Sequence, residues 1–359
     1  MNHILFYDGA CPAPYSSASL RLPGSKIGGA EATVVRIAER LAKTYRVTVG
    51  QHNRTSRESS EDGRLLWLTG KEASDSLLKP DVVVVQRRVG DLPTVCRHHP
   101  GARLFVWSHD WFDGVPGFSL SSLKWQAKVE ARFFLHARYN AASVAVSQTH
   151  RENIRESLNH LRLLRFLRNR VRLEFVYNPI DDNIAPPANP AAYDPTKLIY
   201  FSAAWKGLDM VLATFAEVHR RFPDLKLHVA SPGYHPIDPA TTPATDNVVF
   251  LGSLSHENVL REVSTSLCVF YPADKVPETF GLVFAESNAV GTPVLAHPFG
   301  AAPELLTADQ LVNAHDTSGI IRRLGEWKDG RRPVVRAKEE LRMSNVVRSW
   351  ERVLFSNDH

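Results

Sequence analysis

Two glutamates, eight positions apart, lie in the stretch PETFGLVFAE, with a glycine between them: Glu278, Gly281 and Glu286. The apolar spacing predicts a helix that begins near Phe280 or Gly281, so Glu278 precedes it and Glu286 lies in its second turn. A carboxylate accepts paired hydrogen bonds from neighbouring hydroxyls, and the N–H groups of a helix's first turn bind phosphate. The spacing is compatible with a site for a sugar phosphate and does not by itself decide between this site and a structural role. Two ordinary glutamates, one complementing the helix dipole and one on the surface, are the alternative.

Three other segments carry residues suited to the same chemistry. Gly28 and Gly29 precede a predicted helix, where backbone N–H groups can cradle an anion, although most such pairs are turns. His109 follows a predicted strand, at the edge where open α/β sheets place their sites, although a lone histidine is more often structural. Lys206 occupies a strand-to-helix turn, where its point charge suits a diphosphate.

The Glu278–Glu286 segment resembles the Glu–seven residues–Glu signature of retaining glycosyltransferases with the GT-B fold, known as group 1 or family 4. Its flanking residues match as well: Gly281, Ala285, Gly291, Thr292 and Pro293. Further segments resemble the family in the same order along the chain: Gly28–Glu31, Val106–Asp110, Tyr177–Asp181, Tyr200–Gly207, Leu251–Leu254 and Phe299–Glu304.

The resemblance implies roles for particular side chains. It assigns the chemistry to three residues, His109, Lys206 and Glu278, with Asp110 as a candidate to orient His109. It implies donor-sugar contacts from His109, Glu278, Thr279 and Phe280. It implies contacts to the nucleotide and its diphosphate from Gly28, Gly29, Lys206, Gly252, Ser253, Leu254, Phe280, Gly281, Leu282 and Glu286. The family usually has both Arg and Lys in the loop that here contains Lys206 as its only cation, so the second cation is unassigned.

The implied reaction moves a hexose from a UDP- or GDP-linked donor to an acceptor hydroxyl, on a glycan or lipid-linked glycan, with retention of anomeric configuration. The donor is a co-substrate, and no bound cofactor is expected. The chain contains no Asp-x-Asp, the metal-binding signature of the other large glycosyltransferase fold, so no metal is expected either. A nucleotide-sugar epimerase on the same fold and a non-catalytic sugar-binding module remain alternatives. A dehydrogenase is disfavoured because the first strand–helix turn has no Gly-x-Gly-x-x-Gly.

Short apolar runs alternate with amphipathic segments, which predicts two doubly wound, Rossmann-like α/β domains facing a central cleft. The predicted strands are Ile4–Tyr7, Arg46–Val49, Val82–Val85, Leu104–Trp107 and Ser143–Val146, then Leu198–Phe201, Lys226–Ala230, Asn247–Leu251, Leu267–Tyr271 and Pro293–Ala296. A Pro-rich linker over 182–196 separates the two sets. We therefore expect an acceptor-binding domain at 1–181 and a nucleotide-sugar-binding domain at 182–335. We also expect a terminal helix within 336–359. It packs either on the second domain or, if the chain crosses back, on the first.

The 359 residues carry a net charge of +5, and seven arginines against two glutamates between Arg151 and Arg172 account for all of it. Apolar residues recur there every three or four positions, at Ile154, Leu158, Leu161, Leu164 and Leu167. One interpretation is an amphipathic helix on an anionic membrane. The other is a core-packing helix, leading into a strand near 171–176. Nucleic-acid binding is disfavoured because no aromatic platform accompanies the arginines. Three distant cysteines and the lack of a leader or long apolar run favour the cytoplasm, with peripheral attachment to the inner face of the membrane if this segment binds lipid.

Overall fold

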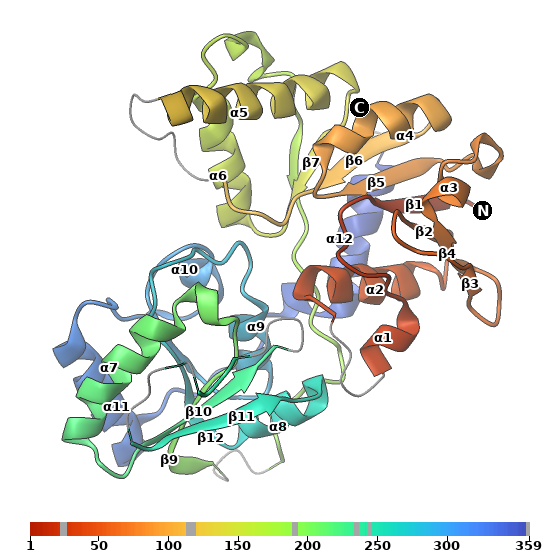
Figure 1. The fold of residues 1–359 in the computed structure, drawn as a ribbon. Helices are drawn as coiled ribbons and strands as arrows, with labels where there is room; N and C mark the ends of the chain where they lie inside the picture. Colours follow the sequence, from red (N-terminus) through yellow and green to blue (C-terminus); the bar gives the residue numbers. More distant parts are fainter. Residues whose placement is uncertain are drawn as a thin grey trace. The chain divides into compact units, whose positions relative to one another are not determined.

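A computed structural model describes residues 1–21, 27–112, 120–188, 193–232, 237–240, 242 and 246–356. The chain forms two compact units (Figure 1). The first comprises Met1–Leu20, Ala30–Pro179 and Val346–His359, and the second comprises Arg21–Gly29 and Ile180–Asn345. Each unit is an α/β layer structure around its own parallel sheet, which confirms the predicted fold class.

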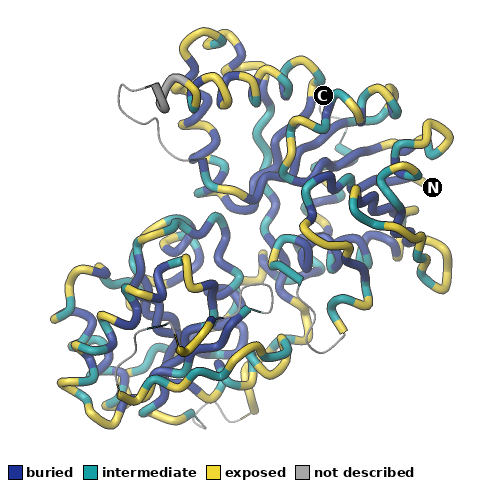
Figure 2. Tube along the Cα trace, in the orientation of Figure 1, coloured by how far each residue is buried: buried dark blue, intermediate teal, exposed yellow. Residues whose placement is uncertain are grey.

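The first unit contains an eight-stranded sheet in the order β3-β4-β2-β1-β5-β6-β7-β8. Its strands are β1 (His3–Asp8), β2 (Arg46–Gln51), β3 (Glu58–Ser59), β4 (Leu65–Thr69), β5 (Val82–Gln86), β6 (Arg103–Trp107), β7 (Ala142–Ala145) and β8 (Leu173–Phe175). All pair in parallel except β3, which runs antiparallel to β4 at the edge. The central strands are buried along their length, as Figure 2 shows, because helices cover both faces.

The helices of this unit are α1 (Ser17–Arg21), α2 (Gly29–Leu41), α3 (Gly70–Ala73), α4 (Leu92–His98), α5 (Leu120–Arg138), α6 (Gln148–Asn159) and α12 (Met343–Phe355), with 3₁₀ turns η1 (Ser76–Leu78), η2 (Val89–Asp91) and η3 (Arg165–Leu167). Successive strand residues face opposite sides of the sheet. Leu5 accordingly packs in one cluster with Leu92 and Val95 of α4, whereas the ring of Phe6 lies 6.4 Å from that of Trp350 on α12. The last helix thus packs mainly on the first unit's sheet.

The second unit has a five-stranded parallel sheet in the order β11-β10-β9-β12-β13. Its strands are β9 (Asp194–Tyr200), β10 (Lys226–Ser231), β11 (Val248–Ser253), β12 (Ser266–Tyr271) and β13 (Val294–Ala296). Its helices are α7 (Leu208–Arg221), α8 (His256–Ser264), α9 (Leu282–Ala289), α10 (Ala302–Leu305) and α11 (Thr317–Glu326), with short turns η4 (Ala204–Lys206), η5 (Ala308–Gln310), η6 (Trp327–Arg331) and η7 (Glu339–Leu341). Phe270 packs against Phe215 of α7 and its neighbour Tyr271 against Phe284 of α9, so these helices cover opposite faces.

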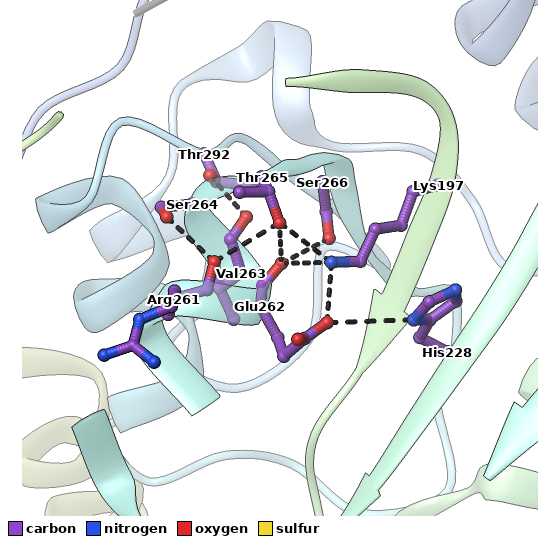
Figure 3. A network of polar contacts seen from close by, with 9 residues as sticks. All are labelled: Lys197, His228, Arg261, Glu262, Val263, Ser264, Thr265, Ser266 and Thr292. Carbon is purple, nitrogen blue, oxygen red and sulfur yellow. Dashed lines mark hydrogen bonds and ion pairs between the residues drawn. The ribbon is translucent and has the colours of Figure 1, made fainter. Parts of the chain in front are cut away.

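A polar network ties the end of α8 to β9 and β10 (Figure 3). The ammonium of Lys197, on a residue 8% exposed, lies 2.7 Å from a carboxylate oxygen of Glu262 and donates to that residue's backbone carbonyl (3.0 Å) and to the hydroxyl of Thr265 (2.8 Å). A cation at the C-terminal carbonyls of a helix also complements the helix dipole. This network holds the α8–β12 connection, away from the carboxyl ends of the strands, so we assign it to stability.

The basic segment does not form the continuous amphipathic helix that its leucine spacing suggested. Helix α6 ends at Asn159, and a turn containing η3 leads to β8. Four of the five apolar side chains in the pattern are buried in one cluster: Ile154, Leu158, Leu161 and Leu167. The pattern therefore reflects packing in the core of the first unit.

Candidate active site

The sheet of the second unit changes its winding direction between β9 and β12. From β9 the chain adds β10 and then β11 on one side, and it crosses to the other side for β12 and β13. In open α/β sheets, ligands bind beyond the carboxyl ends of the strands at such a switch point. The loop after β9 carries Lys206, and the loop after β12 carries Glu278.

These two side chains are bound to each other. The ammonium of Lys206 lies 2.7 Å from Oε1 and 2.8 Å from Oε2 of Glu278. The hydroxyl of Tyr271, the last residue of β12, donates to Oε1 of the same carboxylate (3.1 Å). Burial and then the charge of Glu278 hold the pKa of Tyr271 well above its usual value, so its hydroxyl remains a donor across the working pH range.

Two helix N-termini flank this pair. α7 begins after Gly207 (φ +111°) and α9 after Gly281 (φ +86°), and no side chain caps either helix. The other described helices of at least eight residues in this unit, α8 and α11, are capped by the side chains of Ser255 and Asp316. Uncapped first-turn N–H groups beside a lysine suit an anion.

The backbone of Glu278 is fixed by the glycine-containing turn after β13. Gly300 (φ +59°) lies so close that a Cβ there would be 2.6 Å from the carbonyl oxygen of Glu278, and the N–H of Ala301 donates to that oxygen (2.9 Å). Between Glu278 and α9, Thr279 is half-buried, whereas the ring of Phe280 is 1% exposed. Phe280 therefore presents almost no surface to a ligand in this structure.

Glu286 lies in the second turn of α9, as predicted from the sequence, and is 5% exposed. Its Oε1 accepts a hydrogen bond from Nε2 of His256, the first residue of α8 (2.9 Å). Gly252 and Ser253, at the exposed end of β11, and Leu254 precede this helix. The structure thus brings Glu286 next to the strand end that the sequence assigned to the nucleotide.

His109 lies in the first unit, directly after β6. Its Nε2–H donates to Oε1 of Gln86, the last residue of the neighbouring strand β5 (3.1 Å), which places a proton on Nε2. Burial, and then the charge of Arg87, hold the pKa of His109 well below its usual value. The backbone carbonyl of Asp110, the residue expected to orient His109, accepts a hydrogen bond from Nε2 of His150 (2.9 Å), and Gln86 is a further residue that fixes the His109 ring.

The first unit has a switch point of its own, between β1 and β5. A Cβ at Gly9 would lie 2.2 Å from Oδ2 of Asp91, and Arg88 donates to the carbonyl of Gly9 (2.7 Å). Oδ2 of Asp91 is buried and has no hydrogen-bond partner in the described part of the chain. Gly28 comes just before α2, and Gly29 is its first residue.

Sequence reasoning missed three residues that support the predicted ones. Tyr271 and Gln86 are the last residues of apolar strands. A polar group at that position could have been predicted to face the site. Nothing in the sequence connected His256 with Glu286, because the contact depends on how α8 packs beside α9.

A family model matches most of the second unit. Residues 189–343 match the model described as "Glycosyl transferases group 1". This part of the chain is therefore similar to the group 1 glycosyltransferases. A 109-residue stretch is 28% identical to the "GDP-mannose-dependent monoacylated alpha-(1-6)-phosphatidylinositol monomannoside mannosyltransferase" of Corynebacterium glutamicum. That match spans 28% of this chain and 29% of the mannosyltransferase.

Solved glycosyltransferases show the same GT-B fold over the whole chain. Sucrose-phosphate synthase from Thermosynechococcus elongatus superposes with a TM-score of 0.62 at 15% identity, covering 99% of this chain and 95% of that one. The structure described as "Trehalose-6-phosphate from E. coli bound with UDP-2-fluoro glucose" gives 0.64 at 11% identity, covering 98% and 99%. AviGT4, a glycosyltransferase involved in avilamycin A biosynthesis, gives 0.57 at 14% identity, covering 99% and 93%.

Among the residues that the structure describes, no helix combines the length and the apolar character needed to span a membrane. No group of three or more His, Cys, Asp or Glu side chains in the same residues is arranged to hold a metal ion.

Proposed function

We propose that the protein is a retaining hexosyltransferase that takes its sugar from a UDP- or GDP-linked donor and passes it to a hydroxyl of a glycan or lipid-linked glycan without a metal. The observation that carries the proposal is the Lys206–Glu278 pair at the switch point of a unit similar to group 1 glycosyltransferases, between two uncapped helix N-termini. The mannosyltransferase relative makes GDP-mannose the first donor to test.

In this proposal the donor diphosphate lies at the first turns of α7 and α9 and competes with Glu278 for Lys206. Glu278 then turns its oxygens to the hexose hydroxyls, with Tyr271 keeping the carboxylate in place. Glu286 binds the ribose hydroxyls, and the exposed end of β11 meets the base. His109 keeps the role of donor-sugar contact that the resemblance implies, and Asp91 offers a carboxylate for the acceptor at the carboxyl edge of the first unit's sheet.

Lys275 is our candidate for the second cation. It lies in the loop after β12. Its Cβ is 3.5 Å from the position that a Cβ would take on Gly207, the residue that precedes α7. Its ammonium is half-exposed and binds Asp209, in the first turn of α7 (2.7 Å). A lysine from the neighbouring loop thus stands beside the turn that lacks its usual arginine.

The proposed reaction breaks the bond between the anomeric carbon and the β-phosphate oxygen, and the electron pair leaves on the diphosphate. The acceptor oxygen bonds to the same carbon on the same face, and its proton passes to the departing phosphate oxygen. No protein nucleophile is involved. Lys206, Lys275 and the first-turn N–H groups stabilise the charge that develops on the leaving group.

The test incubates the protein with GDP-mannose, UDP-glucose and UDP-N-acetylglucosamine, with and without EDTA, and follows nucleotide release and product anomer by NMR. We expect release from one donor, an unchanged anomeric configuration and no effect of EDTA. Glu278→Gln and Lys206→Ala should slow release by about a hundredfold or more, as loss of a group that stabilises transition-state charge does.

The matched controls remove a similar ion pair elsewhere in the same unit, Lys328→Ala and Asp224→Asn, and should leave the rate unchanged. Folded Glu278→Gln and Lys206→Ala variants as fast as the parent would overturn the assignment. Inversion of the donor sugar without net nucleotide release would indicate an epimerase instead.

A further inference from the structure

The turn between α6 and β8 exposes two large apolar side chains. Leu163 is 84% exposed and Phe166 is 59% exposed, although their neighbours Leu161 and Leu167 are buried in the core. Figure 2 shows the exposed stretches of this turn at the top of the view. Leaving such side chains in water sacrifices the free energy of burying them, so their exposure in one short turn indicates a partner.

The turn is held in shape from below. The carboxylate of Glu130 on α5 is buried and accepts three consecutive backbone N–H groups, those of Arg162 (2.9 Å), Leu163 (3.0 Å) and Leu164 (3.1 Å). Gln126, one helical turn earlier, donates to Glu130 and to the carbonyl of His160 (both 3.0 Å). The turn that exposes Leu163 is therefore fixed by hydrogen bonds to side chains of α5.

Arginines surround the apolar pair. Arg165 and Arg170 are exposed within the turn, and the guanidinium of Arg170 lies 5.9 Å from the ring of Phe166. Beside the turn is an open cavity of about 240 Å³, lined mainly by polar groups that include Arg155 and Arg168. Arg155 also pairs with Glu152, and Arg168 also donates to the carbonyl of Leu161 (2.9 Å), so a phosphate-sized group in the cavity would meet guanidinium groups that are already held in place.

We propose that this turn, residues 161–170, docks the protein on an anionic phospholipid membrane. Leu163 and Phe166 enter the boundary between headgroups and acyl chains, while Arg165 and Arg170 meet lipid phosphates and the cavity at Arg155 and Arg168 receives a headgroup. An apolar pair within a cationic rim matches such a surface, because each part alone gives only weak attachment. Where the proposed transfer reaction holds, this surface favours a lipid-linked acceptor.

The test is sedimentation with vesicles of phosphatidylcholine alone or mixed with phosphatidylglycerol, without any nucleotide sugar. We expect binding only to the mixed vesicles, weakening as salt is raised. Leu163→Ser/Phe166→Ser should weaken binding about tenfold or more, because each buried apolar side chain contributes on that scale. Arg165→Gln/Arg170→Gln should weaken it about thirtyfold and reduce its salt dependence.

The matched controls lie on other surfaces of the same unit. Leu77→Ser removes an equally exposed leucine, and Arg57→Gln/Arg64→Gln removes two exposed arginines, so both should bind like the parent. Absence of binding to mixed vesicles would overturn the proposal, as would parental binding by the Leu163/Phe166 variant. If the Leu163→Ser/Phe166→Ser variant binds both the mixed vesicles and a soluble polyanion such as heparin as the parent does, the turn is a general anion site instead. None of these outcomes bears on sugar transfer, which is measured separately.

Discussion

Lys206 and Glu278 come from loops after neighbouring parallel strands, and the lysine ammonium contacts both oxygens of the carboxylate. Sequence reasoning gave these residues different ligands, the diphosphate and the hexose. Their direct pairing means that each holds the other in position before a donor arrives, so a change at one should disturb the other. The supporting residues around the pair therefore offer sharper tests than the pair itself.

Tyr271→Phe removes the hydroxyl that donates to Glu278 while keeping the ring stacked on Tyr200. A hydrogen bond to a charged group contributes about 1.5–3 kcal/mol, so we expect kcat to fall by about tenfold to a hundredfold with little change in nucleotide affinity. Tyr200→Phe removes the other hydroxyl of the stack, which donates to the carbonyl of Ala203, and is the matched control. Equal kcat values for the two variants would show that Tyr271 does not position Glu278.

Gly300→Ala should damage the site through the backbone of Glu278. The new Cβ would lie 2.6 Å from the carbonyl oxygen of Glu278, so the loop must move. Gly330 has a similar left-handed conformation (φ +89°) with nothing within 4 Å, so Gly330→Ala carries the conformational strain without the collision. We expect both variants to lose about 1–3 kcal/mol of unfolding free energy in urea titrations, and only Gly300→Ala to lose most of its transfer rate.

The sequence predicted the features that depend on neighbouring residues along the chain and missed those that depend on contacts between distant segments. Apolar runs such as Val82–Val85 identified the central strands because burial on both faces leaves an unbroken signal. The helix α5 was not predicted, and the edge strand β8 was expected, near 171–176, only in the core-packing alternative for the arginine-rich segment, which was also open to a membrane interpretation. Its leucines pack on α5 and η3, contacts set by tertiary structure, which periodicity alone does not determine. The Tyr271–Glu278 and His256–Glu286 contacts escaped prediction for the same reason.

His256→Ala tests whether the histidine positions Glu286 for a nucleotide. Its Nε2 binds Oε1 of the buried carboxylate, so its loss leaves that oxygen without this donor. We expect the Kd for the preferred nucleoside diphosphate to rise by about threefold to tenfold, the scale of one hydrogen bond. Titration calorimetry measures this, with His315→Ala, which removes another exposed histidine–carboxylate contact in the same unit, as control. Tighter binding by His256→Ala would mean that the histidine competes with the ribose.

Buried histidines make the first unit sensitive to acid. Burial lowers the pKa of His136 from 6.5 to about 4, although the ring donates through Nδ1 to the carbonyl of Ala141. Burial likewise lowers the pKa of His150 to about 4. Because the unfolded chain binds these protons more readily, stability is fully present above about pH 6.5 and is lost as pH falls toward 4.

His136→Gln isolates one of these contributions. Between pH 7 and pH 5 each such histidine lowers the free energy of unfolding by about 2 kcal/mol, since one pKa unit corresponds to about 1.4 kcal/mol. Urea titrations at the two pH values should therefore give a difference about 2 kcal/mol smaller for His136→Gln than for the parent, whatever its absolute stability. His52→Gln, at an exposed histidine of the same unit, is the control and should retain the parental difference. An undiminished difference in His136→Gln would show that His136 is not the group whose protonation opposes folding.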